Sequence, residues 1–402
     1  MNILKNIKKV AVGISGGVDS AVAALLLKRK GYEVVGVFMK NWDLTDENGH
    51  CSSEADQNDA CFVCHKLSIP FHEVNFVKPY WNQVFEELIN DYKNGFTPNP
   101  DILCNKYIKF RRFCDHATDR LGCDYIATGH YARRSFPEID SCTSTVRLLK
   151  AKDPDKDQTF FLSQIPQNSL QKTLFPLGDF MKTEVKKIAL ENGLEKIAKK
   201  KESMGMCFIG NRHFPSFIDD YVDAKEGVFM DIDSGKIVGR HSGKHQFTVG
   251  QSCKLGGFVD KVYVARKNEN EDIYVAMGHE HPVFYGKHVF TTSPHWIHSE
   301  PYELSRSWVL SCQFRFQHRN PLIDCVVFKR PSNELLVVLD DPLRALTPGQ
   351  FAVLYRGEEC LGSARITYAG PSEHTLRAGQ GDSCHLSDLD SIQEQAAKKC
   401  TN

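Results

Sequence analysis

Residues 10–20 read V-A-V-G-I-S-G-G-V-D-S, and this stretch limits the possible fold more than any other part of the chain. An apolar, β-branched run typical of a strand is broken by residues 15–17. Asp19 and Ser20 then begin an Ala- and Leu-rich segment, which is typical of a helix. Glycines let backbone N–H groups approach an anion, and a helix N-terminus favours negative charge. The stretch therefore predicts a strand, a turn and a helix that together bind phosphate.

Strand and helix patterns alternate through the first half of the chain. We expect strands at residues 32–39, 69–76 and 125–127, and helices at residues 21–30, 79–92, 105–121 and 182–192. Such alternation predicts a parallel sheet with helices on both faces. Ligands bind these sheets outside the C-terminal strand ends. This rule would place the phosphate loop, Met39 and Gly129 around one crevice.

The pattern changes to short strands and turns from about residue 227. Candidate strands lie at residues 229–232, 236–238, 262–265, 273–276, 323–328, 334–338, 351–355 and 362–368. Short strands with regular turns favour a small barrel. We therefore expect an α/β catalytic domain at 1–215, a central β-rich domain at 216–285, a C-terminal β-barrel at 286–385 and a polar tail at 386–402.

The composition restricts the class of protein but does not indicate what the protein binds. Lys+Arg and Asp+Glu both number 50, so the net charge is zero, although basic clusters at 106–112 and 196–201 could face phosphates or form solvated helix faces. The 14 cysteines are irregularly spaced and no secretory signal is visible, which favours free thiols in a reduced compartment. No apolar run approaches the ~20 residues of a membrane helix, so we expect no membrane partner.

Two cysteines stand in contexts that favour a reactive thiolate. Cys104 ends T-P-N-P-D-I-L-C at the expected entrance of a helix, and Cys207 follows three lysines in E-S-M-G-M-C-F-I-G. A helix N-terminus or nearby ammonium groups lower a thiol pKa, whereas the alternative for each cysteine is a small buried hydrophobe. Asp101, three residues before Cys104, suits general acid/base chemistry or helix capping.

The phosphate loop resembles the S-G-G-x-D-S loop of the PP-loop ATP pyrophosphatases, which split ATP between its α and β phosphates. Further segments match one family of that superfamily in order. They are F-M-K-N-W at 38–42, T-P-N-P-D-I-L-C-N-K at 97–106, A-T-G-H-Y at 127–131, K-D-Q-T-F-F-L at 156–162, M-C-F-I-G at 206–210 and T-P-G-Q-F-A-V at 347–353. The chain thus resembles the tRNA-specific 2-thiouridylases, and E-S-M-G-M-C looks like their animal mitochondrial form.

The resemblance implies a role for each matching residue. Cys104 would be the nucleophile, Cys207 the persulfide carrier and Asp101 a catalytic partner. The residues implied in ATP binding are Gly13, Ile14, Ser15, Gly16, Gly17, Val18, Asp19, Ser20, Met39 and Gly129. The residues implied in tRNA binding are Asn99, Pro100, Asp101, His130, Lys156, Asp157, Gln158, Arg315, Phe316 and Gln350. Phe316 alternates with Phe314, so barrel core is an equally good interpretation of Phe316.

The implied reaction makes chemical sense. AMP transferred from ATP to the C2 oxygen of the wobble uridine creates a leaving group, Mg²⁺ and loop amides hold the pyrophosphate, and a persulfide sulfur then attacks C2. The base must leave the anticodon stack to reach the crevice. The implied partners are a tRNA anticodon stem-loop and an upstream persulfide donor protein.

Three alternatives stay open at this stage. One is a PP-loop enzyme that makes an amide or a guanidine, and another is a non-catalytic tRNA-binding protein. An iron–sulfur cluster on Cys104 and Cys207 would replace the persulfide chemistry. The C-x-x-C at Cys61 and Cys64, with Cys51, could hold zinc, but a lone C-x-x-C does not predict a structural metal.

The location of the protein follows mainly from the resemblance. Residues 1–9 contain three lysines and no acidic residue, which is weakly like a mitochondrial presequence. We therefore expect a mitochondrial protein, or a cytoplasmic one if the likeness to the animal form misleads. The sequence does not indicate the tRNA isoacceptors, the group on C5 of the uridine, the sulfur donor, the oligomeric state or the role of the tail.

Overall fold

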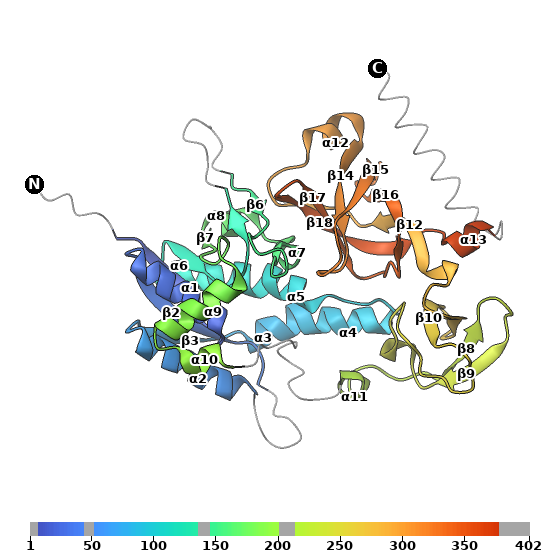
Figure 1. Cartoon of the computed structure of the whole chain (residues 1–402), viewed down its shortest axis with the longest axis horizontal. Coiled ribbons are helices and arrows are strands. Elements are labelled where there is room, and N and C mark those ends of the chain that lie inside the picture. Colours follow the sequence, from blue (N-terminus) through green and yellow to red (C-terminus); the bar gives the residue numbers. More distant parts are fainter. Residues whose placement is uncertain (1–6, 44–51, 136–144, 201–213, 378–402) are drawn as a thin grey trace, which may run out of the picture. The chain divides into compact units, whose positions relative to one another are not determined.

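The computed structural model of the chain describes residues 7–43, 52–135, 145–200 and 214–377 (Figure 1). Cys51 and Cys207 lie outside these ranges. The chain divides into two compact units, which we describe separately. Unit 1 comprises residues 1–86, 100–213 and 358–361, and unit 2 comprises residues 87–99, 214–357 and 362–402.

Unit 1 contains the expected parallel sheet. Its strand order is β3-β2-β1-β4-β7, and every neighbouring pair is parallel. The strands are β1 (Lys9–Gly13), β2 (Glu33–Lys40), β3 (Phe71–Asn75), β4 (Tyr125–Ala127) and β7 (Thr173–Leu174). The order turns back at β1, with β2 on one side and β4 on the other. Such a switch point opens a crevice at the C-terminal strand ends, where the phosphate loop begins.

Helices cover this sheet because both of its faces are apolar. Val10 and Val12 of β1 pack with apolar side chains of α1, α2 and α9 in one buried cluster, while Ala11, on the opposite face of the strand, is also fully buried. The helices are α1 (Val18–Arg29), α2 (Ser52–Lys66), α3 (Val77–Tyr80), η1 (Trp81–Phe85), α5 (Pro100–Leu103), η2 (Cys104–Arg112), α6 (Phe113–Asp119), α7 (Thr159–Leu162), α8 (Gln167–Gln171), α9 (Lys182–Glu191) and α10 (Glu195–Ala198).

The helix that carries Cys104 begins earlier than the sequence predicted. The expected start at residue 105 is wrong, because α5, η2 and α6 run without interruption from Pro100. Proline suits a first helical position, where its missing N–H costs nothing. Cys104 is therefore buried one turn inside the helix and not at its entrance, which weakens the dipole argument for its thiolate. It is also the first residue of the π-helical segment η2, a rare conformation often found at functional sites.

Unit 2 contains a four-stranded sheet of order β10-β11-β8-β9. Its strands are β8 (Gly227–Asp231), β9 (Ile237–His241), β10 (Val262–Lys267) and β11 (Ile273–Met277). Phe229, Val264 and Val275 form part of its buried core. The helices of unit 2 and its short strand β13 are α4 (Glu86–Lys93), α11 (Phe214–Asp219), η3 (Lys244–Gln246), η4 (Pro282–Phe284), β13 (His295–Trp296), α12 (Tyr302–Ser307) and α13 (Glu373–Arg377).

The predicted barrel is confirmed as a closed six-stranded barrel of order β12-β16-β15-β14-β17-β18, in which β18 pairs back with β12. Its strands are β12 (Tyr285–Thr291), β14 (Val309–Arg315), β15 (Ile323–Lys329), β16 (Leu335–Arg344), β17 (Phe351–Arg356) and β18 (Glu359–Ala369). The sequence analysis missed the barrel strands β12 and β14. The first residues of β18 belong to unit 1, where they pair with β6 (Leu148–Leu149), which pairs with β5 (Arg133–Arg134).

Candidate functional site

The phosphate loop between β1 and α1 is closed by the hydroxyl of Ser20. This hydroxyl donates to the Gly17 carbonyl at 3.1 Å and accepts the Ser15 N–H at 3.1 Å. The Ser15 and Ser20 hydroxyl oxygens are 3.2 Å apart. Ser20 is buried, so its side chain shapes the loop from within.

Gly16 is required because the loop packs against α2. Its φ is +72°, a conformation that other residues rarely adopt. A Cβ built on Gly16 would lie 2.7 Å from the Asp56 carbonyl oxygen and 2.9 Å from Asp59 Cβ. Helix α2, which the sequence analysis did not predict, therefore forms the back of the phosphate loop.

Gly129 and Met39 lie beside the same loop. A Cβ on Gly129, after β4, would lie 2.6 Å from the Ser20 nitrogen, so the absence of a side chain lets this segment approach the start of α1. Met39 Cε would lie 2.9 Å from a Cβ on Gly13, at the end of β1. The structure thus brings Met39 and Gly129 beside the phosphate loop, at the C-terminal ends of β1, β2 and β4.

Asp19 is held by two side chains that the sequence analysis did not single out. Lys182 Nζ lies 2.7 Å from both carboxylate oxygens, and the Tyr131 hydroxyl donates to Asp19 at 2.8 Å. Lys182 begins α9 and its side chain is only 10% exposed. A buried lysine is rare unless paired, but its partner is 163 residues away and the sequence gives no local sign of the pairing.

Two lysines of the predicted basic cluster at 196–201 form ion pairs within unit 1. Lys196 and Lys200 both form ion pairs with Asp59, at 2.7 and 2.6 Å, and Lys200 also pairs with Asp56 at 2.8 Å. The hydrogen bonds and charges of these lysines lower the pKa of Asp59, against the opposing effect of its burial. Lys196 of α10 and Lys200 just after it are therefore joined to α2 by ion pairs that neither interpretation of the cluster predicted.

Asp101 and Lys109 form the charged surroundings of the helix that carries Cys104. Desolvation raises the pKa of the Asp101 carboxyl, although its side chain remains exposed, and the charge of Lys109 partly opposes this rise. A carboxyl group with a raised pKa is suited to proton transfer near neutral pH. Lys109 lies within the predicted basic cluster at 106–112, but its proximity to Asp101 was not foreseen.

His130 is a neutral, buried imidazole. Its Nδ1 is 2.8 Å from the Thr128 hydroxyl, and its ring lies 5.6 Å from that of Phe110 in η2. Desolvation, aided by the charge of Lys109, lowers the pKa of His130 well below its usual value. The ring therefore acts as a hydrogen-bonding group and not as a cation that attracts phosphate.

Residues 156–158 are partly committed to holding unit 1 together. Asp157 is buried and accepts the Ala151 N–H at 3.0 Å and the Thr159 hydroxyl at 2.8 Å. The Gln158 side chain accepts the Tyr131 N–H at 2.9 Å. Of these three residues, Lys156 best fits the predicted contact with tRNA. Its side chain is a cation and is only half-buried, whereas Asp157 is buried.

In unit 2, two residues predicted to contact tRNA meet each other. Gln350 is hydrogen bonded to Asn99, whose Nδ2 donates to it at 3.1 Å. Arg315, at the end of β14, lies over the ring of Tyr355 at 5.7 Å. Phe316 is fully buried beside Phe314, so its side chain belongs to the barrel core, as the alternative interpretation allowed.

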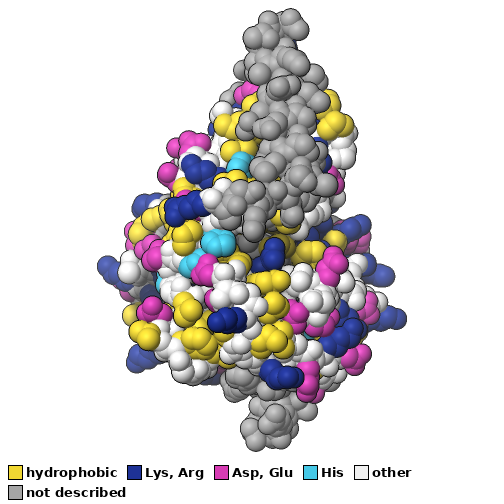
Figure 2. Space-filling view, turned by 90° about the vertical axis from the view of Figure 1, so that its right-hand side faces the viewer, with side chains coloured by type: hydrophobic (Ala, Val, Ile, Leu, Met, Phe, Trp, Pro, Cys, Tyr) yellow, Lys and Arg dark blue, Asp and Glu magenta, His cyan; other side chains and the backbone are white. Residues whose placement is uncertain are grey.

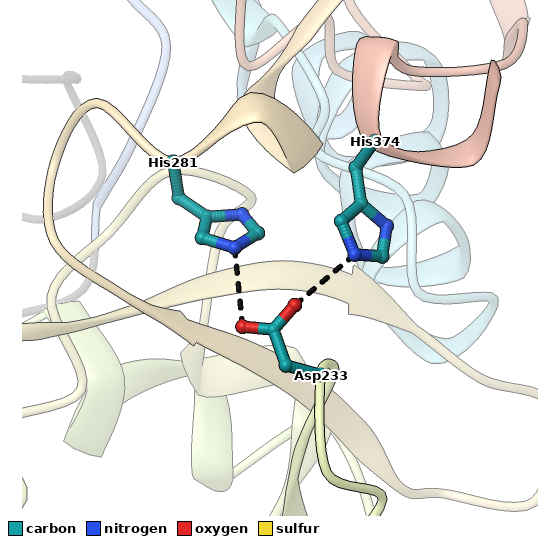
Figure 3. Close-up of side chains that lie close together, drawn as sticks. All are labelled: Asp233, His281 and His374. Atoms are coloured by element: carbon teal, nitrogen blue, oxygen red, sulfur yellow. Dashed lines mark hydrogen bonds and ion pairs between the residues drawn. The ribbon is translucent and has the colours of Figure 1, made fainter. Parts of the chain in front are cut away.

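A second polar cluster in unit 2 consists of Asp233, His281 and His374 (Figure 3). Asp233 lies 3.2 Å from His281 Nε2 and 3.1 Å from His374 Nε2. Within the described residues this is the one group whose ligand atoms are close enough to hold a metal ion. However, His281 Nδ1 accepts the Val283 N–H, which leaves the proton on Nε2. Metal binding through Nε2 needs the opposite tautomer, so we assign this cluster a structural role.

The described surface is mixed in charge and contains no membrane helix. Basic and acidic side chains are interspersed on the face shown in Figure 2. No helix of the described residues is long and apolar enough to cross a membrane.

Comparison with known proteins identifies the family. The mitochondrial tRNA-specific 2-thiouridylase 1 of Drosophila melanogaster is 52% identical to this chain over 370 residues, which cover 91% of this chain and 95% of that protein. The chain belongs to the tRNA-specific 2-thiouridylase family. A bacterial member, the tRNA-specific 2-thiouridylase of Lactiplantibacillus plantarum, is 45% identical over 92% of this chain and 98% of its own length. The family therefore includes relatives of nearly full length in animals and bacteria.

Family profiles match three successive parts of the chain. A tRNA methyl transferase HUP domain matches residues 8–211, a tRNA methyl transferase PRC-barrel domain matches residues 215–277, and an aminomethyltransferase β-barrel domain matches residues 287–366. The solved structure of the U34-tRNA thiolase NcsA from Methanococcus maripaludis with its [4Fe-4S] cluster is 21% identical, with a TM-score of 0.32 over 54% of this chain and 66% of that chain. That TM-score is too low for a structural argument.

Proposed function

We propose that this chain uses ATP to replace the C2 oxygen of the wobble uridine in tRNA with sulfur. The observation that carries the proposal is the closed phosphate loop with its paired Asp19, in a chain 52% identical to a tRNA 2-thiouridylase. The same loop in an amide or guanidine ligase would need neither Cys104 nor Cys207. Both cysteines stand in the motifs through which the sequence resembles the thiouridylases.

In the first step the loop holds the phosphates of ATP while the uridine C2 oxygen attacks the α phosphorus. The bond between the α and β phosphates breaks and pyrophosphate leaves, so the uridine carries AMP. Lys182 is placed to stabilise the departing negative charge if it turns from Asp19 toward the phosphates. Mg²⁺ carried by ATP would neutralise phosphate charge. Asp19 is paired with Lys182 in this structure, and its carboxylate would be open to that Mg²⁺ once Lys182 turns toward the phosphates.

In the second step the terminal sulfur of a Cys207 persulfide attacks C2, and AMP leaves. The Cys104 thiolate then attacks the Cys207 sulfur, which breaks the sulfur–sulfur bond and leaves one sulfur on the uridine. The resulting Cys104–Cys207 disulfide must be reduced by a dithiol, which supplies two electrons. Asp101, with its raised pKa, is suited to move the protons of these steps. A disulfide requires the two Cα atoms to approach within about 7 Å.

The remaining assignments are proposals of the same kind. A persulfide donor protein loads Cys207, and the substrate is the anticodon stem-loop of a mitochondrial tRNA. Residues 1–215, 216–285 and 286–385 act as catalytic, central and barrel domains. The relatives' names, which place several of them in mitochondria, support a mitochondrial location.

Persulfide labelling followed by peptide mass spectrometry tests the roles of the two cysteines. Cys207→Ser should lose the protein-bound persulfide and all thiolation, whereas Cys104→Ser should accept the persulfide but fail to turn over. Cys123→Ser, which changes a buried cysteine just before β4 that has no proposed role, is the control and should keep full activity. Full turnover in either single variant, or stoichiometric iron in anaerobically purified protein, would contradict the two-cysteine mechanism.

A further inference from the structure

Residues 97–99 of unit 2 are held by a side chain from the far end of the sequence. Gln350 Nε2 donates to the carbonyl oxygens of Thr97 and Pro98, at 3.0 and 3.1 Å. Gln350 Oε1 accepts the Asn99 side-chain amide at 3.1 Å. Both amide hydrogens of Gln350 are therefore used by this loop, and 251 residues separate Gln350 from Asn99.

Gly349 brings the turn that carries Gln350 against the same loop. The Thr97 N–H donates to the Pro348 carbonyl at 3.0 Å. A Cβ on Gly349 would lie 2.7 Å from the Thr97 oxygen and 2.8 Å from the Thr97 nitrogen, and the φ of Gly349 is +95°. Only glycine fits here without moving the loop.

The turn is itself fastened to the barrel. The Gly349 N–H donates to the Ile366 carbonyl, and the Ile366 N–H donates to the Gln350 carbonyl, both at 2.8 Å. Because Ile366 lies in β18, residues 348–350 have little freedom to move independently of the barrel. The barrel thus determines the conformation of residues 97–99.

The segment that precedes the loop, from α4 to Phe96, is also held by side chains of unit 2. Arg365 of β18 pairs with Asp91 of α4 and lies over the ring of Phe96 at 5.3 Å. Lys267 of β10 donates to the Gly95 carbonyl at 3.2 Å. Every contact in this arrangement is within unit 2, and the segment that it holds ends one residue before Pro100, where the helix of Asp101 and Cys104 begins.

We propose that Gln350 and Gly349 are positioning residues, which set the loop at 97–99 and hold Asn99 in the conformation in which it meets the target uridine. The inference rests on the proposed function for the identity of that base. Gln350 acts through Asn99 and the loop backbone and does not act mainly as a contact to RNA. A misplacement of about 1 Å can cost about 100-fold in rate, whereas tRNA affinity depends chiefly on cationic contacts to phosphates.

The test compares Gly349→Ala with Gly357→Ala. Gly357 also has a left-handed φ, +58°, but a Cβ there would meet nothing within 4 Å, so its substitution reproduces the backbone strain without touching the loop. We expect Gly349→Ala to speed amide hydrogen exchange at Thr97 and to lower kcat at saturating tRNA about 10- to 100-fold. Its Kd for tRNA should stay within about threefold, and Gly357→Ala should match the wild type in all three measurements.

Side-chain variants keep the test decisive if Gly349→Ala fails to fold. Gln350→Ala and Asn99→Ala should each lower kcat, and the double variant should be no slower than the slower single variant, because both remove one interaction. Additive losses in kcat, a loss confined to tRNA affinity, or unchanged Thr97 exchange would overturn the proposal. If the wild type does not thiolate tRNA, the proposed function fails, while hydrogen exchange still decides whether Gly349 and Gln350 hold the loop.

Discussion

At the scale of single residues, the phosphate loop depends on charges and contacts that its own sequence does not reveal. The motif places Asp19 correctly at a helix start, and the structure confirms the strand, the turn and the helix. The partners of Asp19, Lys182 and Tyr131, come from distant segments whose local patterns describe only a helix and a strand end. Periodicity reports which face of an element is buried, and it contains no information about which polar groups meet across the fold.

The pairing of Lys182 with Asp19 leads to a first prediction. Lys182→Met leaves the Asp19 carboxylate without its cation, and removing one partner of a buried ion pair costs about 3–5 kcal/mol. This cost lowers the free energy of unfolding, at the low end of the range because Asp19 is 32% exposed. ATP-dependent thiolation should separately fall about 100-fold, as when one preorganised group that stabilises developing charge is removed. Lys187→Met, on the exposed face of the same helix, is the control. An equal effect of both substitutions in a rate assay would refute a specific role for Lys182.

At the scale of elements, the helix α2 was not predicted, although it packs directly against the phosphate loop at Gly16. Its buried apolar residues Ala60, Val63 and Cys64, with Leu67 just after its end, follow helical spacing. The rest of the segment is polar, and a cysteine pair drew attention to metal binding instead. The start of the helix that carries Cys104 was also misplaced, because a proline was taken for a loop residue when it is the first residue of the helix. For the helix that carries Cys104 the type of element was predicted and its first residue was not, whereas α2 was missed altogether.

The packing of α2 on Gly16 gives a second prediction. Gly16→Ala should abolish ATP binding in a calorimetric titration, because its Cβ would lie 2.7 Å from the Asp56 carbonyl and must displace either the loop or α2. Gly31→Ala is matched in conformation, with a φ of +85°, and its Cβ would meet nothing within 4 Å. The control should therefore bind ATP like the wild type. ATP binding by Gly16→Ala at wild-type affinity would show that α2 does not fix the loop.

Lys267, which donates to the Gly95 carbonyl just after α4, gives a pH-dependent prediction. Burial and the charge of Lys244 lower the pKa of Lys267 to about 8, from 10.5 in the unfolded chain. Between pH 8 and 10 the unfolded chain therefore binds more protons than the folded protein. The free energy of unfolding should rise with pH over that range, by at most about 1.4 kcal/mol per pH unit.

Urea unfolding of the wild type and of Lys267→Met at pH 8, 9 and 10 measures this effect. The stability of the wild type relative to the variant should increase with pH, because the variant lacks the titrating group. Lys261→Met, which removes an exposed lysine near the start of the same strand, should follow the wild type. Parallel pH dependence of the wild type and Lys267→Met would contradict the lowered pKa.

At the scale of the whole molecule, the sequence motifs predicted the architecture well, but they did not predict the contacts between distant residues. The parallel sheet and the closed barrel are both present, and the family assignment agrees with relatives of nearly equal length. The domain boundaries and the roles of individual residues remain predictions. The link between Gln350 and residues 97–99 could not be foreseen, because a turn motif specifies its own conformation and not the loop it will hold 251 residues away.

The most direct measurement is nucleoside mass spectrometry of a tRNA incubated with the purified chain, ATP and a persulfide donor. We predict 2-thiouridine at the wobble position only when ATP is present, with one AMP and one pyrophosphate formed for each sulfur incorporated. Asp19→Ala should lose this product while its Kd for tRNA stays within about threefold, because RNA affinity depends chiefly on cationic side chains that contact phosphates and Asp19 is not one of them. Sulfur incorporation without ATP, or ATP cleavage to AMP with no 2-thiouridine, would contradict the account.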